Sequence, residues 1–208
     1  MAKPSSGRGL FLTEFVRSPL NTASVLPSSP HLSAPMVAPI DARGEPTVVE
    51  LGPGTGAFTA AIQQRLAGRG QHVAVELNER LADHLSERFR NLSVVTDTAE
   101  RLPEILAHHG CGSADVVVSG LPWSAFAGGD LIDTIASSLT SGGVYTQFGY
   151  TWTRWAPPAR RQRAQLRAAF QQVSLSPTVW RNLPPAAVSV ARRPRSATHE
   201  CIDGLPGR

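Results

Sequence analysis

The sequence predicts an α/β fold in which seven strands form a mostly parallel sheet with helices on both faces. From residue 47 onward, short apolar strand patterns alternate with helical patterns, which is typical of a parallel sheet. The last two strand patterns, 173–179 and 186–191, flank the short turn 182–185, as an antiparallel closing pair requires. With 208 residues, of which 41% are hydrophobic, the chain suits one domain with a sizeable core.

The first 43 residues are expected to form a helical segment outside the main domain. An amphipathic pattern at 10–17 ends at Ser18-Pro19, because a residue before proline avoids the helical region. A second turn at 27–30 precedes the apolar stretch 32–37. This segment is interpreted either as a lid or membrane-contact element, or as a helix packed across the core domain.

The main domain is expected over residues 44–192, and 193–208 form a polar tail that we expect to be flexible. The parallel strands are predicted at 47–51, 72–76, 92–96, 114–118 and 143–149, and the helices at about 56–68, 78–89, 99–109, 129–139 and 158–172. Ligands of such sheets bind beyond the carboxyl ends of the strands, so residues there are candidates for chemistry.

A glycine-rich loop follows the first of these strands. Gly52, Gly54 and Gly56 let backbone approach a ligand closely, and Glu50 places a carboxylate at the strand's end. The spacing of Gly52, Gly54 and Ala57 also satisfies the dinucleotide fingerprint, so the spacing alone leaves a nicotinamide or flavin cofactor open. The fuller pattern E-x-G-x-G-x-G resembles the first motif of class I S-adenosylmethionine-dependent methyltransferases, which implies S-adenosyl-L-methionine as cofactor and a Rossmann-like fold.

Acidic residues end the next two strands. Glu76 is predicted to hold a ribose diol through two hydrogen bonds, although it or Asn78 could instead cap the following helix. Asp97 is a candidate partner for the adenine amino group, with helix capping as the alternative. Leu77, Thr98 and Ser119 complete the predicted cofactor-binding set.

The stretch after the fourth strand, 115–123, lies where the methyl acceptor meets the cofactor in this fold. Its residues Ser119-Gly120-Leu121-Pro122-Trp123 resemble the N/D-P-P-Y/F and N-L-P-Y loops of amino-methylating enzymes. In those families a side-chain amide holds the target amine, and here Gly120 stands in its place. This departure disfavours adenine in RNA, because a planar amine would lose its hydrogen-bond acceptor.

Together these stretches resemble the bacterial, soluble-type phospholipid N-methyltransferases. The matching pieces span residues 15 to 190 in order: Phe15-Val16-Arg17-Ser18-Pro19, Ser24-Val25-Leu26-Pro27-Ser28-Ser29, Val49 to Gly56, Val118-Ser119-Gly120-Leu121-Pro122, Gln147-Phe148-Gly149-Tyr150 and Val179 to Ala186. The resemblance implies a membrane-surface enzyme that methylates the amine of phosphatidylethanolamine, with its N-terminal helix on lipid.

The acceptor side is assigned on chemistry. Tyr150 is the candidate to hold the amine, with Ser119 and the Gly120 carbonyl nearby, and Trp123 could attract a methylated ammonium by cation–π contact or simply pack. Arg181 is the candidate for a head-group phosphate, with a structural role for its guanidinium as the alternative. In the N-terminal segment, Phe15 completes the predicted substrate-binding set.

Charge bears on the partners. The net charge is +4, and the excess of arginine lies in the two flanks of an acidic centre. This distribution indicates either that the flanks contact an anionic membrane or nucleic acid, or that they form an ordinary solvated surface. No apolar run reaches the roughly 20 residues that span a bilayer. Cys111 and Cys201 lack metal-ligand spacing, so we predict that the protein binds no metal. We expect a reduced, cytoplasmic protein, either free or bound peripherally at the inner membrane face.

The sequence therefore predicts N-methylation of a phospholipid head group, with two alternatives. Trp123, Trp152 and Trp155 make the acceptor side unusually aromatic, so an enzyme of natural-product metabolism is the first competitor. It would methylate, cyclise or isomerise a lipophilic small molecule. The second, an RNA adenine methyltransferase, is less favoured because the centre is acidic and the loop lacks asparagine.

Overall fold

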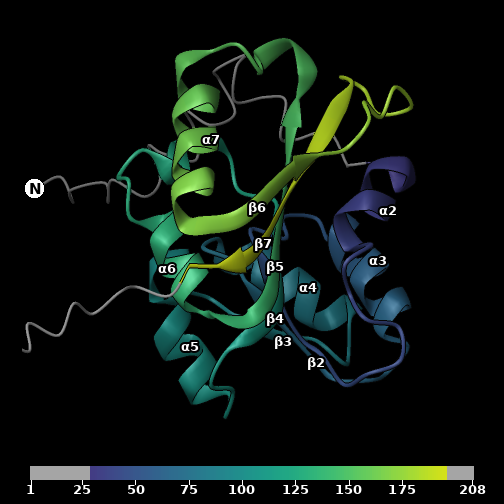
Figure 1. The fold of residues 1–208 in the computed structure, drawn as a ribbon. Coiled ribbons are helices and arrows are strands. Elements are labelled where there is room, and N and C mark those ends of the chain that lie inside the picture. The colour runs from purple at the N-terminus through teal and green to yellow at the C-terminus, as the bar shows by residue number, and fades with distance from the viewer. Residues whose placement is uncertain (1–28, 196–208) are drawn as a thin grey trace, which may run out of the picture.

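A computed structural model of the protein describes residues 29–195 (Figure 1). The strands are β1 (Thr47–Leu51), β2 (Gln71–Val75), β3 (Ser93–Val95), β4 (Ala114–Ser119), β5 (Leu139–Tyr150), β6 (Phe170–Leu175) and β7 (Ala186–Pro194). The α-helices are α2 (Pro30–Val37), α3 (Ala57–Leu66), α4 (Glu79–Arg88), α5 (Leu102–His108), α6 (Leu131–Ser137) and α7 (Pro157–Ala169). Short 3-10 turns are η2 (Ala99–Arg101), η3 (Trp123–Phe126) and η4 (Thr151–Thr153).

The seven strands form one sheet in the order β3-β2-β1-β4-β5-β7-β6. Strands β1 to β5 pair in parallel, whereas β7 pairs antiparallel with both β5 and β6. The predicted fold class, a mostly parallel sheet with an antiparallel C-terminal pair, is confirmed. The strand order reverses between β1 and β4, so their carboxyl ends, Leu51 and Ser119, lie opposite each other where ligands bind in such sheets.

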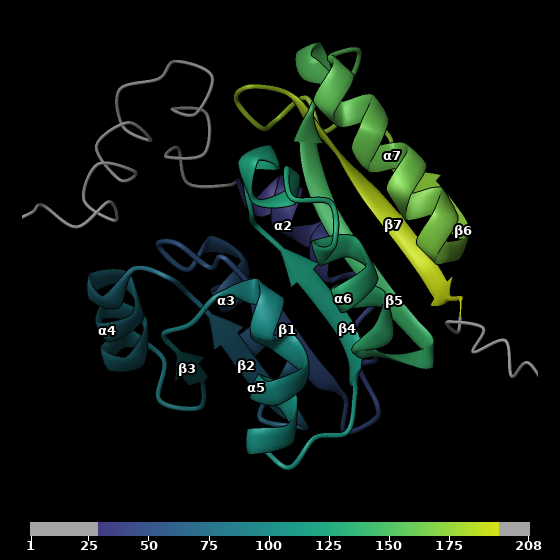
Figure 2. The same cartoon turned by 90° about the vertical axis from the view of Figure 1, so that its left-hand side faces the viewer.

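Helices cover both faces of the sheet (Figures 1 and 2). The inward residues of α2 and α3 pack with Val48, Val116 and Val188 in one apolar cluster. Residues of α5, α6 and α7 form the second cluster with the opposite face of the strands, where Val49 and Val117 lie. Helix α4 lies beside β3, at the edge of the sheet far from α7 (Figure 2).

The predicted bounds of three elements are wrong. The last helix was expected to reach 172 and the next strand to span 173–179, but α7 ends at Ala169 and β6 spans Phe170–Leu175. Phe170 is fully buried and stacks on Tyr145 with ring centroids 6.2 Å apart, so tertiary packing overrides the helical pattern. Strand β5 also starts at Leu139 rather than 143, because it pairs with Ala114 across a register shift.

The described part of the N-terminal segment is packed against the domain. Ser29 caps α2, and Leu32, Met36 and Ile40 are buried in the α3-side cluster. The backbone amide of Ser29 donates to the Asn182 side chain at 3.0 Å, which ties α2 to the turn before β7. Phe15 and the pattern at 10–17 lie outside the described residues. Within 29–195, no helix has both the length and the apolar character needed to cross a bilayer.

Candidate active site

The glycine loop between β1 and α3 has the backbone that its sequence requires. Gly52, Gly54 and Gly56 have φ values of +66°, +57° and +84°, in the left-handed region that favours glycine. A Cβ at Gly52 would lie 2.8 Å from the Leu121 side chain, whereas one at Gly54 would meet nothing within 4 Å. Gly54 therefore borders open space, which is the cradle a bound cofactor needs.

Glu76 holds this loop from the end of β2. Its carboxylate is buried and accepts hydrogen bonds from the backbone amides of Gly54 and Asn78, each at 3.0 Å. A carboxylate has about four acceptor sites, so two remain for hydroxyl groups. Leu77, next in the chain, is 63% exposed and offers an apolar surface beside that carboxylate. The pair suits a ribose and an aromatic base.

Glu50 is fully buried beneath the loop. Its Oε2 accepts from the Thr59 hydroxyl at 2.7 Å and lies 3.3 Å from His72 Nε2 without hydrogen-bond alignment. The Gln63 amide nitrogen lies 2.8 Å from His72 Nδ1 on the other side of the ring. Glu50 Oε1 has no partner among the described residues. An unpartnered buried carboxylate oxygen is suited to an ammonium group.

Asp97 and Thr98 follow β3. Asp97 accepts from the Thr98 backbone amide at 2.8 Å and forms an ion pair with Arg101 at 2.8 Å. These contacts serve the start of η2, so the adenine role of Asp97 stays a prediction. The glycine cradle, Glu76, Leu77 and the unpartnered oxygen of Glu50 together fit a nucleoside cofactor that carries an amino group, as S-adenosylmethionine does.

The acceptor loop after β4 packs directly on the glycine loop. The Gly120 amide donates to Leu51 O at 2.8 Å, and a Cβ on Gly120 would lie 2.6 Å from Gly52 O. Real Cβ atoms do not approach backbone oxygen so closely, so no side chain fits at position 120 without backbone movement. Glycine is therefore sterically required at position 120, and it also leaves the loop without the side-chain amide found in the amino-methylating families.

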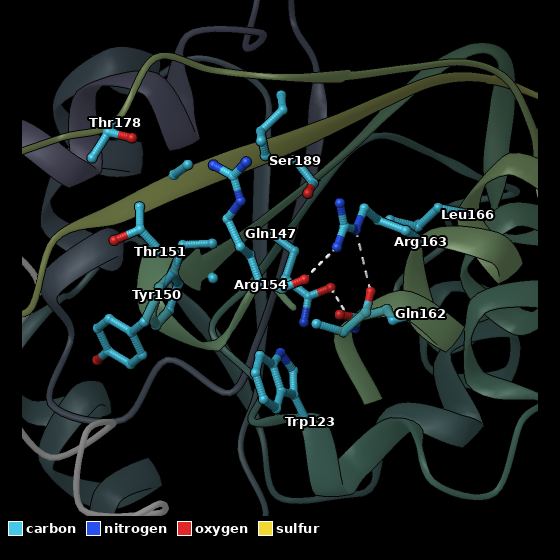
Figure 3. A pocket seen from close by; sticks show the side chains of 15 residues that line it. Trp123, Gln147, Tyr150, Thr151, Arg154, Gln162, Arg163, Leu166, Thr178 and Ser189 are labelled. Atoms are coloured by element: carbon cyan, nitrogen blue, oxygen red, sulfur yellow. Dashed lines mark hydrogen bonds between the residues drawn. The ribbon is translucent and has the colours of Figure 1, made fainter. Parts of the chain in front are cut away.

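A cavity lies among β5, β7 and α7, and Trp123, which follows this loop, is part of its wall (Figure 3). Trp123 and Tyr150, which the sequence assigns to the acceptor, both belong to its wall, but the Tyr150 ring packs edge-on against Phe148 at 5.6 Å on the α2 and α3 side of the sheet. Burial raises the pKa of the half-buried Tyr150 phenol. The phenol is therefore neutral at physiological pH. The other lining residues are Gln147, Phe148, Gly149, Thr151, Arg154, Ala159, Gln162, Arg163, Leu166, Leu175, Thr178, Ala187 and Ser189.

A buried polar network that sequence reasoning missed centres on Gln147. Its side-chain oxygen accepts from the Tyr145 hydroxyl at 2.9 Å and from Gln162 Nε2 at 2.8 Å, and its amide reaches Leu121 O at 3.5 Å. Gln147 also lies opposite Ser119 in the sheet register. Burial raises the pKa of Tyr145, with a smaller opposing effect of a hydrogen bond to Ser119. The network links the acceptor loop to the cavity wall, and the Gln147-Phe148-Gly149-Tyr150 piece was its only sequence signal.

The predicted phosphate ligand Arg181 does not line the cavity. It is exposed on the turn between β6 and β7. Arg154 and Arg163 line the cavity instead, and Arg163 donates to the backbone oxygens of Ala159 and Arg154 (Figure 3). Their spacing of nine residues across a 3-10 turn and a helix carried no motif, so the sequence did not single them out.

Comparisons with known proteins place this site in context. The sequence profile of the family Ribosomal RNA adenine dimethylase matches residues 28–99, which contain the glycine loop and Glu76. The ornithine lipid N-methyltransferase of Singulisphaera acidiphila is 34% identical over 191 residues, covering 88% of this chain and 94% of that protein.

Solved methyltransferase structures share the fold. An S-adenosylmethionine-dependent O-methyltransferase from Thermotoga maritima matches with a TM-score of 0.58 at 14% identity, over 86% of this chain and 72% of that chain. A precorrin-6y C5,15-methyltransferase from Geobacter metallireducens matches with a TM-score of 0.59 at 17% identity, over 77% and 87%. At such identities the likeness extends to the fold alone.

Proposed function

This chain belongs to the S-adenosylmethionine-dependent methyltransferase family that includes the ornithine lipid N-methyltransferase, and we propose that it methylates the amine of a lipid head group. The enzyme class and the cofactor follow from family membership. The finer assignment, a phosphatidylethanolamine-like phospholipid as acceptor, is part of the proposal. The observation that carries it is the near full-length match to a lipid N-methyltransferase.

The chemistry requires few protein groups. S-adenosylmethionine supplies an electrophilic methyl group, so the protein has to align a neutral amine with it. Removal of the acceptor from water lowers the pKa of its ammonium, which favours the nucleophilic form. We assign Tyr150 to accept a hydrogen bond from the amine and Trp123 to face the nitrogen, with Ser119 and the Gly120 carbonyl near the amine and beside the cofactor loop.

An anionic group on the acceptor suits the basic wall of the cavity. Arg154 and Arg163 approach it from η4 and α7, and a guanidinium binds phosphate or carboxylate through paired hydrogen bonds. We propose that these two arginines face the head group's acid, and that Arg181 on the outer turn has a secondary part. This arrangement accommodates the phosphate of a phospholipid and the carboxylate of an amino-acid lipid.

An RNA acceptor is the less favoured alternative for a structural reason. The RNA dimethylase profile matches residues 28–99, the part of the chain that carries the cofactor site. The acceptor loop lies beyond that range, and its Gly120 leaves no room for the amide that would hold adenine. The profile match therefore supports the cofactor and leaves the acceptor to the second half of the chain.

Mass spectrometry of the reaction products tests the proposal. The protein is incubated with S-adenosylmethionine and, separately, with phosphatidylethanolamine, an ornithine lipid, a small RNA stem-loop and an extract of the producing cells' small molecules. Stepwise additions of 14 Da to a lipid amine support the proposal. A change confined to the RNA or to a non-lipid small molecule would refute it.

Replacement of Tyr150 by phenylalanine tests its assignment. Loss of the hydroxyl should reduce turnover on the lipid about tenfold to a hundredfold, because misalignment of a reacting amine costs this much. Affinity for S-adenosylmethionine, measured by calorimetry, should change little. Equal losses of turnover and cofactor affinity would indicate a structural role for Tyr150 instead.

A further inference from the structure

Four large apolar side chains, three tryptophans and one leucine, are exposed at one end of the molecule. Trp152, Trp155, Trp180 and Leu183 are 54%, 70%, 77% and 80% exposed, and we call these four residues the aromatic rim. They come from two segments, η4 with the start of α7, and the turn before β7. Both segments lie at the upper end of the view in Figures 1 and 2.

Hydrogen bonds hold the two segments side by side. The backbone amide and hydroxyl of Thr151 both donate to Pro185 O, at 3.0 and 3.1 Å. Tyr150 and Ala186 pair in the sheet, and Val179 bridges to Ala186. Trp152 and Leu183 each lie within two residues of the Thr151–Pro185 contact, so this contact brings rim residues from distant parts of the chain to the same end of the sheet.

Packing of the core does not explain why exposed tryptophans gather at this end of the molecule. Of the four tryptophans in the sequence, three are on the rim, and only Trp123 is elsewhere. Tryptophan has an apolar body and a polar ring nitrogen, and it is enriched where a protein meets the head-group layer of a bilayer. Exposed apolar groups gathered at one place mark interaction sites, whereas single ones are ordinary.

Charge around the rim identifies the partner. Residues 134–199 contain nine arginines and no aspartate or glutamate. Arg154, Arg160 and Arg181 are exposed within or beside the two rim segments, and the Arg154 guanidinium lies 4.5 Å over the Trp155 ring. Exposed aromatic side chains beside exposed arginines complement a surface that is apolar inside and anionic outside, which is a bilayer with acidic lipids.

The rim also adjoins the acceptor cavity. Thr151, Arg154, Leu175 and Thr178 line that cavity and lie in or next to the rim segments. We propose that the aromatic rim docks the protein on an anionic bilayer, so that a lipid head group enters the cavity directly from the membrane plane. The purpose of docking rests on the proposed lipid substrate, but docking itself is tested by a separate experiment.

Tryptophan fluorescence with brominated lipids provides this test. The full chain is mixed with vesicles of phosphatidylcholine and phosphatidylglycerol whose acyl chains carry bromine, a short-range quencher. We expect a blue shift and strong quenching that diminish with salt, because three of the four tryptophans insert. Emission unaffected by vesicles, or already blue-shifted without them, would mean that the chain or a second copy covers the rim, and would overturn the proposal.

Substitutions locate the contact. In Trp152→Ser/Trp180→Ser/Leu183→Ser, vesicle affinity should fall about a thousandfold, on the order of tenfold for each of the three side chains. The matched control Leu77→Ser removes a leucine of 63% exposure at another part of the sheet edge and should leave vesicle affinity unchanged. Arg160→Gln should weaken binding about fivefold, whereas Arg80→Gln on α4 should not. Equal affinity of the rim variant and the wild type would refute docking.

Activity separates this proposal from the proposed function. The rim variant should lose methyl transfer to vesicle lipid but keep transfer to a short-chain, monomeric lipid amine, because the cavity is intact. Equal loss on both acceptors would place the rim in the active site and refute docking. A wild type that binds vesicles through the rim but methylates no lipid amine would retain the docking and reject the lipid substrate.

Discussion

The two halves of the sheet's carboxyl edge have different functions and are built from different parts of the chain, backbone in one half and side chains in the other. The cofactor half, from β1 to β3, depends on backbone: three left-handed glycines and two amides that bind Glu76. The acceptor half, from β4 to β7, depends on side chains that come from β5, η3 and α7, far apart in sequence. Local patterns therefore specify the first half, whereas long-range packing specifies the second.

The two halves meet at Gly120, where the largest effect is expected. Gly120→Asn would place a Cβ 2.6 Å from Gly52 O, so one of the two loops has to move. We expect a loss of about 1–3 kcal/mol in the free energy of unfolding and a fall of methyl transfer below about 1%. Denaturant unfolding and product analysis measure both.

Gly128→Asn is the matched control for this substitution. Gly128 lies two residues beyond the end of η3, where a Cβ would meet nothing within 4 Å. Stability and activity should stay near the wild type. Full activity of Gly120→Asn would show that the loops separate easily, and would remove the steric argument against an amide at this position.

Much of the fold follows from the sequence, for identifiable reasons. The glycine loop and the acids at the ends of β1 and β2 combine strand pattern with turn chemistry, so their positions were predictable. The end of α7 was not, because residues 170–172 continue a helical pattern and only the burial of Phe170 against Tyr145 selects a strand.

The acceptor site was predictable only in part. Trp123 and Tyr150 were identified by their place after strands, and both line the cavity. Gln147 and Gln162 are ordinary polar residues in sequence, and their role appears only when β5 and α7 bring them within 2.8 Å. Arg154 and Arg163 were hidden among the other arginines of the basic C-terminal part for the same reason.

The second-largest effect is expected at two glycines of the cofactor half, one in the cofactor loop and one outside it. Gly54→Ala and Gly68→Ala both place a side chain at positive φ, +57° and +82°, in space that is empty within 4 Å. Each should lose about 1–2 kcal/mol of stability from left-handed strain. Gly54→Ala alone should lower affinity for S-adenosylmethionine, by tenfold or more, because its methyl enters the cradle. Calorimetry showing equal affinities would refute the cradle.

The acceptor half has an equivalent test in Gln147→Leu. This change keeps the volume but removes the Gln147 oxygen that accepts from the buried Tyr145 hydroxyl, which costs about 1–3 kcal/mol. The double variant Tyr145→Phe/Gln147→Leu removes both groups of this hydrogen bond and should recover part of that loss, because Gln162 still lacks its acceptor. Denaturant melts of the four proteins of this cycle give the coupling, and strictly additive losses would mean that the pair does not interact.

The smallest effect is a shift in alkaline titration. Tyr145 and Tyr150 are the two tyrosines of the chain, and burial raises the pKa of both above the usual value of about 10. The unfolded state therefore loses these protons first as pH rises. Stability is unaffected below about pH 9 and falls above about pH 10, by up to about 1.4 kcal/mol per pH unit for the fully buried Tyr145.

Ultraviolet absorbance of phenolate measures this shift directly. Lys3 is the one lysine in the sequence, so few other groups titrate in the same range. Native protein should ionise at higher pH than protein in denaturant, and Tyr145→Phe should remove more of the alkaline loss of stability than Tyr150→Phe, because Tyr150 is only half-buried. A native titration curve that coincides with the denatured one would place both phenols in contact with water, and the acceptor half would then lack the dry interior that its proposed chemistry requires.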